Sequence, residues 1–341
     1  MNSVQLAKRE IGTARLAIVD NSQEFDENHA ALEAIAKQYQ AEIFHAANSE
    51  FKEKFFSHGY GGLRNACLAL AISLKEDVVF LDDDCVPLDG FYSLHRSNLE
   101  KRRIVAGSYV GKSTTMQALM GKFNSSLADF ANGTQSREHA LAKSLEALTG
   151  VSDDVEVNGF SGGNLGIPFE TAAAYCFYPT SYRIEDHLYC ELAKHFTGER
   201  PLVPETPPKA FHKRTGGELN ALYYYYVKDL RGSQIGLAIK QAVENNTPVE
   251  KAVATSSKKL FEDFDKRDLK EIAKLREACA ELESAEVLAE FDKITTLSVS
   301  DWKLEEKEVE KEAGFFLECQ KEWKKFASEG SFLNRANSIA L

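Results

Sequence analysis

The sequence predicts an α/β domain followed by a helical C-terminal region. In residues 1–235, short apolar runs alternate with amphipathic stretches, a pattern typical of a largely parallel sheet flanked by helices. From Gly236 onward strand signals are rare, and apolar residues recur at three- to four-residue spacing among many Glu and Lys residues. We therefore expect two parts, an α/β domain over residues 1–235 and a helical region over residues 236–341.

The individual elements follow this alternation in order. Leu16–Val19 is an apolar run that predicts a strand ending at Asp20, and the apolar spacing from Asn28 to Tyr39 predicts a helix. The later predictions are a strand at Glu42–Ala46, a glycine-rich loop at Gly59–Gly62, a buried helix at Arg64–Leu74, and strands at Asp77–Leu81 and Ile104–Val110.

Composition excludes several classes of protein. A hydrophobic fraction of 43% is enough for a sizeable core, and 52 acidic against 41 basic residues argue against a nucleic-acid binder. The six cysteines form no C-x-x-C pair, which favours reduced thiols over disulfides or a zinc site. The longest apolar stretch, Ala66–Leu74, is about half of the ~20 residues that a transmembrane helix needs. We expect no transmembrane segment and a cytoplasmic location, with peripheral membrane association left open.

The strongest functional signal is the segment Val78–Asp84. Four apolar residues, predicted to form a buried strand, run directly into Asp82, Asp83 and Asp84. Ligands bind at the carboxyl ends of strands in open α/β sheets, and adjacent carboxylates repel one another unless a cation relieves them. The segment therefore predicts a Mg²⁺ or Mn²⁺ site that substrate phosphates would complete, with a solvated acidic turn as the alternative.

Three further segments support a ligand site. Gly59–Asn65 is a glycine-rich stretch before a helix, whose backbone N–H groups suit a diphosphate. Asn158–Pro168 contains four glycines and two asparagines, which allow close backbone approach and offer amides to sugar hydroxyls. Arg183–Leu188 contains an acidic pair, Glu185 and Asp186, that opens a predicted helix and offers a general base. Helix capping alone would also explain that pair.

Together these segments resemble the large inverting glycosyltransferase family 2, which includes cellulose, hyaluronan and spore-coat glycosyltransferases. In that family a helix with an Ala-Arg-Asn-like start precedes a strand that ends in Asp-x-Asp or Asp-Asp-Asp, as Leu63–Asn65 precedes Leu81–Asp84 here. The family's Gly-Gly-Asn-Leu-Ala-Ile-like strand is similar to Gly162–Ile167, and its acidic pair to Glu185–Asp186. The resemblance covers roughly Leu16–Arg214 and implies the GT-A fold, a Rossmann-like mixed sheet flanked by helices, with the helical C-terminal region as an appendage.

The resemblance also implies a reaction and a role for each matched residue. A sugar would pass from a nucleoside-diphosphate sugar to an acceptor hydroxyl, with inversion and with the help of Mn²⁺ or Mg²⁺. The implied roles are Asp186 as catalytic base, Glu185 as a residue that orients the acceptor, Asp20 and Arg64 as nucleotide contacts, Asp82 and Asp83 as ribose or metal contacts, Asp84 as a metal ligand with Asp82 and His212, and Gly162, Gly163 and Asn164 as sugar contacts.

The N-terminus departs from the family pattern. The family has a complete strand and helix before the strand that ends in the nucleobase-binding Asp, whereas 19 residues precede Asp20 here. Either that first strand is missing, or Leu16–Asp20 is itself the first strand. The role of Asp20 depends on which of these holds.

Other functions fit parts of the sequence. Ala106–Ser113 is similar to a P-loop with Ala in place of the first Gly, which would make the protein a nucleoside-triphosphatase acting through Lys112 and Ser113. A nucleotidyltransferase could share the fold and the metal-binding carboxylates. A non-catalytic scaffold would act through the charged C-terminal helices, which are also candidates for a homo-oligomer interface. The donor sugar and the acceptor, whether a glycan, a lipid-linked saccharide, a protein or a small molecule, stay open.

Overall fold

The structure is a computed structural model of the chain, and it divides the protein into two compact units. Unit 1 contains Met1–Ser108, Asn158–Phe211 and Gly314–Leu341, and unit 2 contains Tyr109–Val157 and His212–Ala313. The predicted boundary after residue 235 falls inside helix α9 (Leu222–Glu244), which continues through it without a break. The residues that the structure describes are 3–11, 14–20, 27–46, 52–56, 59–111, 132–134, 136, 139, 156–158, 162–212, 222–264, 270, 272–273, 276–277 and 285–329.

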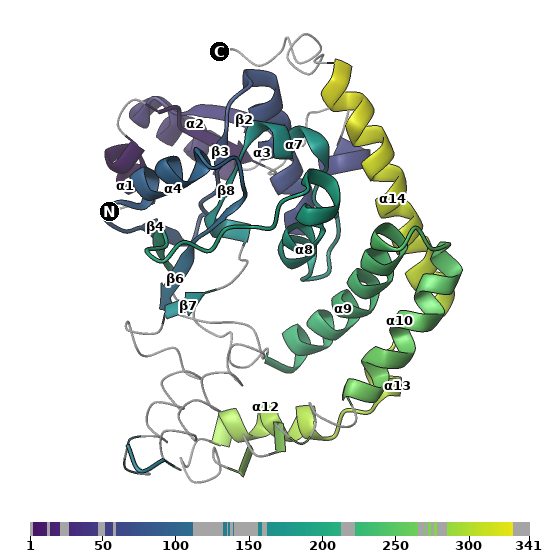
Figure 1. Cartoon of the computed structure of the whole chain (residues 1–341). Helices are drawn as coiled ribbons and strands as arrows, with labels where there is room; N and C mark the ends of the chain where they lie inside the picture. The colour runs from purple at the N-terminus through teal and green to yellow at the C-terminus, as the bar shows by residue number, and fades with distance from the viewer. Residues whose placement is uncertain are drawn as a thin grey trace. The chain divides into compact units, whose positions relative to one another are not determined.

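The first two strands of unit 1 belong to a parallel strand–helix–strand arrangement (Figure 1). Strands β1 (Ala17–Asp20) and β2 (Glu42–His45) are parallel neighbours, and α2 (Glu27–Tyr39) joins them. Parallel strands need such a crossover, because the end of one must return to the start of the next. The predicted strand, helix and strand are confirmed, and Asp20 is buried at the carboxyl end of β1. Helix α1 (Ser3–Ile11), which precedes them, was not predicted.

Helix α3 (Gly59–Leu74) begins earlier than the sequence predicted, because the glycine-rich segment expected to be a loop forms its first turn. A Cβ atom added at Gly59 or Gly61 would lie within 1.9 Å of a backbone carbonyl oxygen, and one at Gly62 would lie 2.6 Å from another. Gly59 also has a positive φ of 57°, which favours glycine. The glycines of this turn therefore serve close packing of the backbone.

A three-stranded sheet forms the middle of unit 1. Its order is β3 (Val78–Val79), β8 (Leu165–Ile167) and β5 (Val105–Ala106), and β8 is antiparallel to both neighbours. The α/β class is confirmed, but the described strands of this sheet are not largely parallel as the sequence predicted. Apolar periodicity indicates which residues are buried and carries no information on strand direction.

The predicted strand Ile104–Val110 is interrupted at Gly107. A Cβ atom at this position would lie 2.1 Å from the side-chain oxygen of Asn164, so the glycine makes room for that side chain. The chain resumes as β6 (Ser108–Gly111), part of a four-stranded sheet of order β4–β9–β6–β7. The other strands of that sheet are β4 (Cys85–Pro87), β9 (Lys209–His212) and β7 (Glu156–Asn158).

The described part of the P-loop-like segment, residues 106–111, does not have the structure that a P-loop requires. A P-loop is a loop between a strand and a helix, whereas this segment is paired strand from Ser108 to Gly111. Lys112 and Ser113 lie outside the described residues. The backbone up to Gly111 therefore argues against the nucleoside-triphosphatase alternative.

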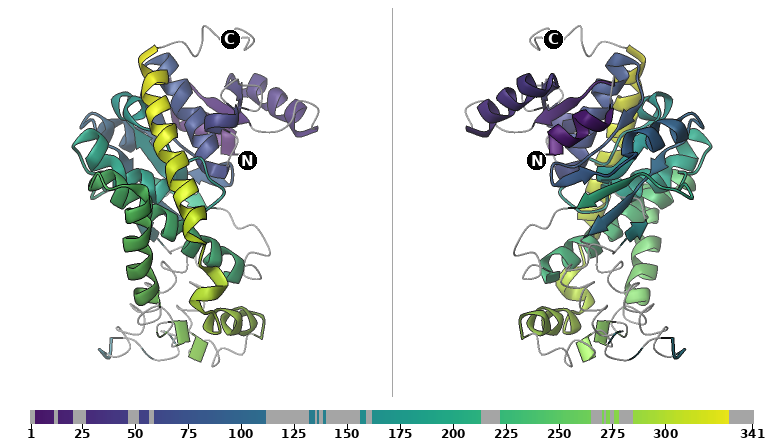
Figure 2. Two further views of the ribbon diagram at one scale, coloured as in Figure 1. Left: turned by 90° about the vertical axis from the view of Figure 1, so that its right-hand side faces the viewer. Right: turned by 90° about the vertical axis from the view of Figure 1, so that its left-hand side faces the viewer.

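The C-terminal part of α14 (Glu306–Glu329) packs on unit 1 (Figure 2). Trp323 is fully buried there, and its indole N–H donates a hydrogen bond to the Ala172 carbonyl at 2.9 Å. Gln320 exchanges hydrogen bonds with the backbone of Cys176 in both directions. The other helical segments of unit 1 are the π-helical turn η2 (Lys52–Phe56), α4 (Phe91–Leu99), the 3-10 turn η3 (Gly162–Asn164), α7 (Phe169–Ala174) and α8 (Glu185–Thr197).

Unit 2 is mostly helical in its described residues, which confirms the predicted helical C-terminal region. Besides α9 it contains α10 (Val249–Asp263), α12 (Ala285–Thr295) and α13 (Val299–Trp302). Gln234 on α9 is buried and donates hydrogen bonds to Ser257 and to the Leu304 carbonyl. None of the described helices is long and apolar enough to cross a membrane. The apolar core of this unit is formed by Tyr226, Leu230, Phe264, Ile272, Phe291, Ile294, Leu297 and Trp302.

The packing of α14 makes a first testable prediction. Trp323→Ala should lower the free energy of unfolding by about 3–5 kcal/mol, because it opens a large cavity and leaves the Ala172 carbonyl without its donor. Urea denaturation followed by circular dichroism measures this change. Lys321→Ala, an exposed position on the same helix, is the matched control and should change stability little. Equal effects of the two substitutions would contradict the packing described here.

Candidate functional site: carboxylates gathered around Arg64

A buried arginine lies at the centre of the candidate site. Arg64 on α3 is only 9% exposed. Its guanidinium forms a close ion pair with Glu185, the first residue of α8 and 121 residues away in sequence. The guanidinium nitrogen Nη2 also lies 3.8 Å from Oδ1 of Asp82. Arg64 thereby joins α3 to the start of α8 and to the chain that follows β3.

Aromatic rings also contact Arg64. Its Cζ atom lies 5.9 Å from the ring centroids of both Tyr60 and Phe177, a distance at which a cation and an aromatic face attract each other. Phe177 belongs to a buried stack, in which its ring centroid is 3.9 Å from that of Tyr189, and Tyr189 is 4.2 Å from Tyr175. The buried stack forms one wall beside the guanidinium.

Glu185 is 4% exposed and faces Arg64. Its pKa is raised to about 7, chiefly because burial disfavours the ionised carboxylate and next because the charge of Asp186 repels it. The ion pair with Arg64 lowers the pKa and so opposes both effects, but it does not outweigh them. Because Glu185 is enclosed and already paired, we assign it the positioning of Arg64 in place of the predicted contact with an acceptor.

The glycine-rich segment and the acidic pair meet beside Arg64. The Asp186 carboxylate accepts a hydrogen bond from the Gly162 backbone N–H at 2.9 Å. A Cβ atom at Gly162 would lie 2.1 Å from Cζ of Arg64, so a side chain there would displace the guanidinium. The Gly163 carbonyl accepts a hydrogen bond from the Asp82 backbone N–H at 3.3 Å. Three predicted motifs, distant in sequence, are thus in contact within unit 1.

The three aspartates after β3 differ in their surroundings. Asp83 is exposed, whereas Asp82 is partly buried. Although 43% of the Asp82 side-chain surface is accessible, the surrounding protein desolvates the carboxylate, and this is the main reason why its pKa is raised. Arg64 lowers that pKa, while the charges of Asp84, Asp186 and Asp83 raise it. A bound cation would relieve the repulsion among these groups.

Asp84 belongs to a small group of potential metal ligands with Cys85 and His212. One ligand atom from each residue lies within 4.8 Å of the others, and the Cys85 thiol donates a hydrogen bond to Asp84 at 3.4 Å. Asp84 and His212 were predicted as ligands, whereas Cys85 was missed although it directly follows the aspartates. Asp82, the third predicted ligand, is not part of this group. Thiolate and imidazole ligands suit softer ions than Mg²⁺, so the group does not by itself select Mn²⁺ or Mg²⁺.

Asn164, predicted to contact a sugar, is completely buried and bonded inside the protein. Its amide nitrogen donates to the carbonyls of Ser108 at 2.8 Å and Pro208 at 3.1 Å. Its oxygen lies 2.8 Å from Nε2 of His95, whose pKa is lowered to about 4 because burial disfavours the imidazolium. The ring is therefore neutral and carries its proton on Nε2. Both amide donors are used, so we infer that Asn164 joins strands and does not bind a sugar.

Asp20 remains a separate prediction. It is 4% exposed at the carboxyl end of β1, the position that the resemblance requires for a nucleobase contact. Residues 21–26, which follow it, lie outside the described residues.

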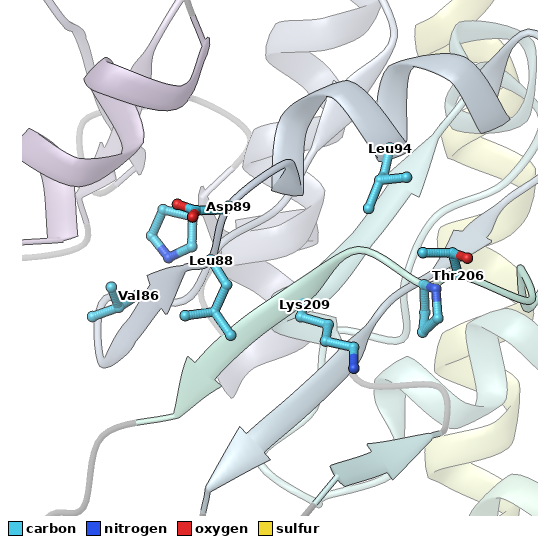
Figure 3. Close-up of a pocket in the computed structure, with 8 residues that line it drawn as sticks. Val86, Leu88, Asp89, Leu94, Thr206 and Lys209 are labelled. Carbon is cyan, nitrogen blue, oxygen red and sulfur yellow. The ribbon is translucent and has the colours of Figure 1, made fainter. Parts of the chain in front are cut away.

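A pocket of about 620 Å³ also occurs in unit 1 (Figure 3). Strand β4, the start of α4 and the segment that leads into β9 form its walls. None of the predicted site residues lines it, so it is separate from the arrangement around Arg64. Its lining residues are Val86, Pro87, Leu88, Asp89, Leu94, Thr206, Pro207 and Lys209.

No protein-family model matches this sequence, and comparisons with curated proteins and with solved structures found no match. The likeness to family 2 glycosyltransferases therefore rests on the sequence motifs. The function that these motifs indicate depends on the geometry around Arg64.

The raised pKa of Glu185 predicts a pH-dependent stability. Its folded-state pKa of about 7 exceeds the ordinary value of 4.5, so the stabilising effect of its proton is complete below 4.5 and is lost as the pH rises through 7. We expect the free energy of unfolding to fall between about pH 5 and pH 8, and to fall less in Glu185→Gln, which cannot ionise. Urea denaturation across this range measures the slope. Glu244→Gln, an exposed position, should keep the wild-type slope; a wild-type slope in Glu185→Gln would refute the assignment.

Proposed function

We propose that this protein is a metal-dependent glycosyltransferase that moves a sugar from a nucleoside-diphosphate sugar to an acceptor hydroxyl, with inversion. The observation that carries the proposal is the sharing of one buried guanidinium, that of Arg64, by Asp82 after β3 and Glu185 at the start of α8. The proposal includes the GT-A fold for unit 1. The parallel β1–α2–β2 arrangement and the antiparallel β8 between β3 and β5 support that fold.

Asp186 is the proposed catalytic base. The hydrogen bond from the Gly162 N–H orients its carboxylate, and the side chain remains partly accessible. An oriented carboxylate can take the proton of the acceptor hydroxyl while that oxygen attacks the anomeric carbon. The bond from the anomeric carbon to the diphosphate oxygen breaks in the same step, so the configuration inverts. Glu185, enclosed behind Asp186, holds Arg64 in place.

The charge of these segments explains why a cation belongs to the proposal. The charges of Asp84, Asp186 and Asp83 act on the Asp82 carboxylate and raise its pKa, so a diphosphate alone would be repelled by these carboxylates. We propose that Asp84 holds Mn²⁺ or Mg²⁺, with His212 and Cys85 within reach of the same ion. Such a cation, when bound, would neutralise the negative charge of the diphosphate leaving group.

Metal-dependent nucleotide binding is the first test of this function. We expect UDP or GDP to bind in the presence of Mn²⁺, and Asp84→Asn to weaken that binding about tenfold or more, because a metal ligand is lost. Calorimetric titration of UDP, GDP and ATP, with and without Mn²⁺, measures the affinities. Asp89→Asn, an exposed aspartate outside the site, is the control and should bind normally.

Two results of this titration would overturn the proposal. If neither nucleoside diphosphate binds with any dependence on metal, the protein has no donor site of the proposed kind. If ATP binds with Mn²⁺, and if this binding persists in Asp84→Asn but is lost in Lys112→Ala, the nucleoside-triphosphatase alternative holds instead.

Asp186 provides a second, independent test. Asp186→Asn should keep the affinity for the donor but slow sugar transfer by about 10²- to 10⁴-fold, because the acceptor hydroxyl loses its base. Release of nucleoside diphosphate from a panel of UDP- and GDP-sugars measures the rate, with glycans, lipid-linked saccharides and small alcohols as acceptors. Glu191→Gln on the same helix is the control. Release of pyrophosphate in place of nucleoside diphosphate would identify a nucleotidyltransferase.

A further inference from the structure

The first turn of α3 presents a single side chain to solvent. Tyr60 is 64% exposed, the largest value among the exposed large hydrophobic side chains of the described residues. The residues around it are Gly59, Gly61 and Gly62, each packed so closely that a Cβ atom would collide with a backbone carbonyl. The ring of Tyr60 thus projects from closely packed backbone. An exposed ring forgoes the stabilisation that burial would give, and a ligand that covers it would regain this.

Tyr60 lies beside the proposed donor site. It precedes Arg64 by four residues on α3, so both side chains lie on the same face of the helix. The Arg64 Cζ atom is 5.9 Å from the Tyr60 ring centroid, and the guanidinium contacts Asp82 and Glu185. Of these two neighbouring side chains, the guanidinium is buried and ion-paired, and the aromatic ring is exposed.

The local charge selects the kind of group that can cover the ring. The guanidinium beside the ring is already paired with Glu185 and Asp82, so it offers an anion little net positive charge, whereas a neutral planar group needs none. A nucleobase is neutral and planar, and it stacks on an aromatic side chain through its face. We propose that Tyr60 is the platform on which the nucleobase of the donor nucleotide stacks.

This inference rests on the proposed function, so its test must separate the base from the diphosphate. The experiment titrates UDP, GDP and inorganic pyrophosphate, each with Mn²⁺, into the full-length wild-type protein and into Tyr60→Ala, Tyr60→Phe and Tyr224→Ala. Tyr224 is the matched control, because it is a 54% exposed tyrosine on a helix of unit 2. Thermal melts confirm that each variant is folded, which the exposure of both positions favours.

We expect Tyr60→Ala to weaken nucleotide binding about tenfold, since stacking on one aromatic side chain contributes this order of affinity. Its affinity for pyrophosphate should not change. Tyr60→Phe keeps the ring and should bind like wild type, as should Tyr224→Ala. This pattern would show that the ring acts on the base and not on the diphosphate or on folding.

Other outcomes each reject a defined part of the argument. If wild type binds nucleotides but Tyr60→Ala binds them equally well, the stacking assignment is wrong and the proposed function stands. If Tyr60→Ala loses pyrophosphate binding as well, the ring acts on the diphosphate site and the nucleobase assignment is also wrong. If wild type binds neither UDP, GDP nor pyrophosphate, the proposed function fails together with this inference.

Discussion

Burying the guanidinium of Arg64 is the constraint on which the candidate site depends. A buried charge costs several kcal/mol unless partners compensate it, and removing one partner leaves the other uncompensated. Here the partners are carboxylates from different parts of unit 1, Glu185 at the start of α8 and Asp82 after β3. The ion pairs therefore tie three elements together, and the same contacts bring Asp186 and the Gly162 N–H into the arrangement. Stability and the proposed chemistry use the same side chains.

Close backbone packing, more than flexibility, explains the glycines of this region. At Gly162 a side chain would collide with Arg64, and at Gly107 it would collide with Asn164. Asn164 in turn bridges two backbone carbonyls and the neutral ring of His95. The sequence suggested that the glycine-rich segments are loops adapted to a ligand. In the structure they mainly provide close contacts between strands and helices. Among the described residues, Asp82 and Asp186 remain partly accessible, and the ring of Tyr60 is exposed.

Electrostatics connects these packed side chains to the proposed metal and nucleotide. Burial and mutual repulsion raise the pKa values of Asp82 and Glu185, so these carboxylates are costly to ionise. A cation at Asp84 would lower this cost, and a diphosphate would bring its own negative charge to that cation. The group of Asp84, Cys85 and His212 adds a thiol that the sequence motifs did not suggest. Because of this thiol, experiments on the choice of metal should include ions softer than Mg²⁺.

The sequence by itself determined the α/β class, the early strand–helix–strand order, the helical C-terminal region, and the segments that meet at Arg64. Apolar spacing and runs of carboxylates encode these features locally. Only the tertiary structure decided that β8 is antiparallel, that Gly59–Gly62 is helix, and that Asn164 is enclosed by Ser108, Pro208 and His95. It also revealed that Glu185 forms an ion pair with Arg64 and that Tyr60 is exposed. These outcomes depend on contacts between residues far apart in the chain, and local patterns do not specify which side chain such contacts cover.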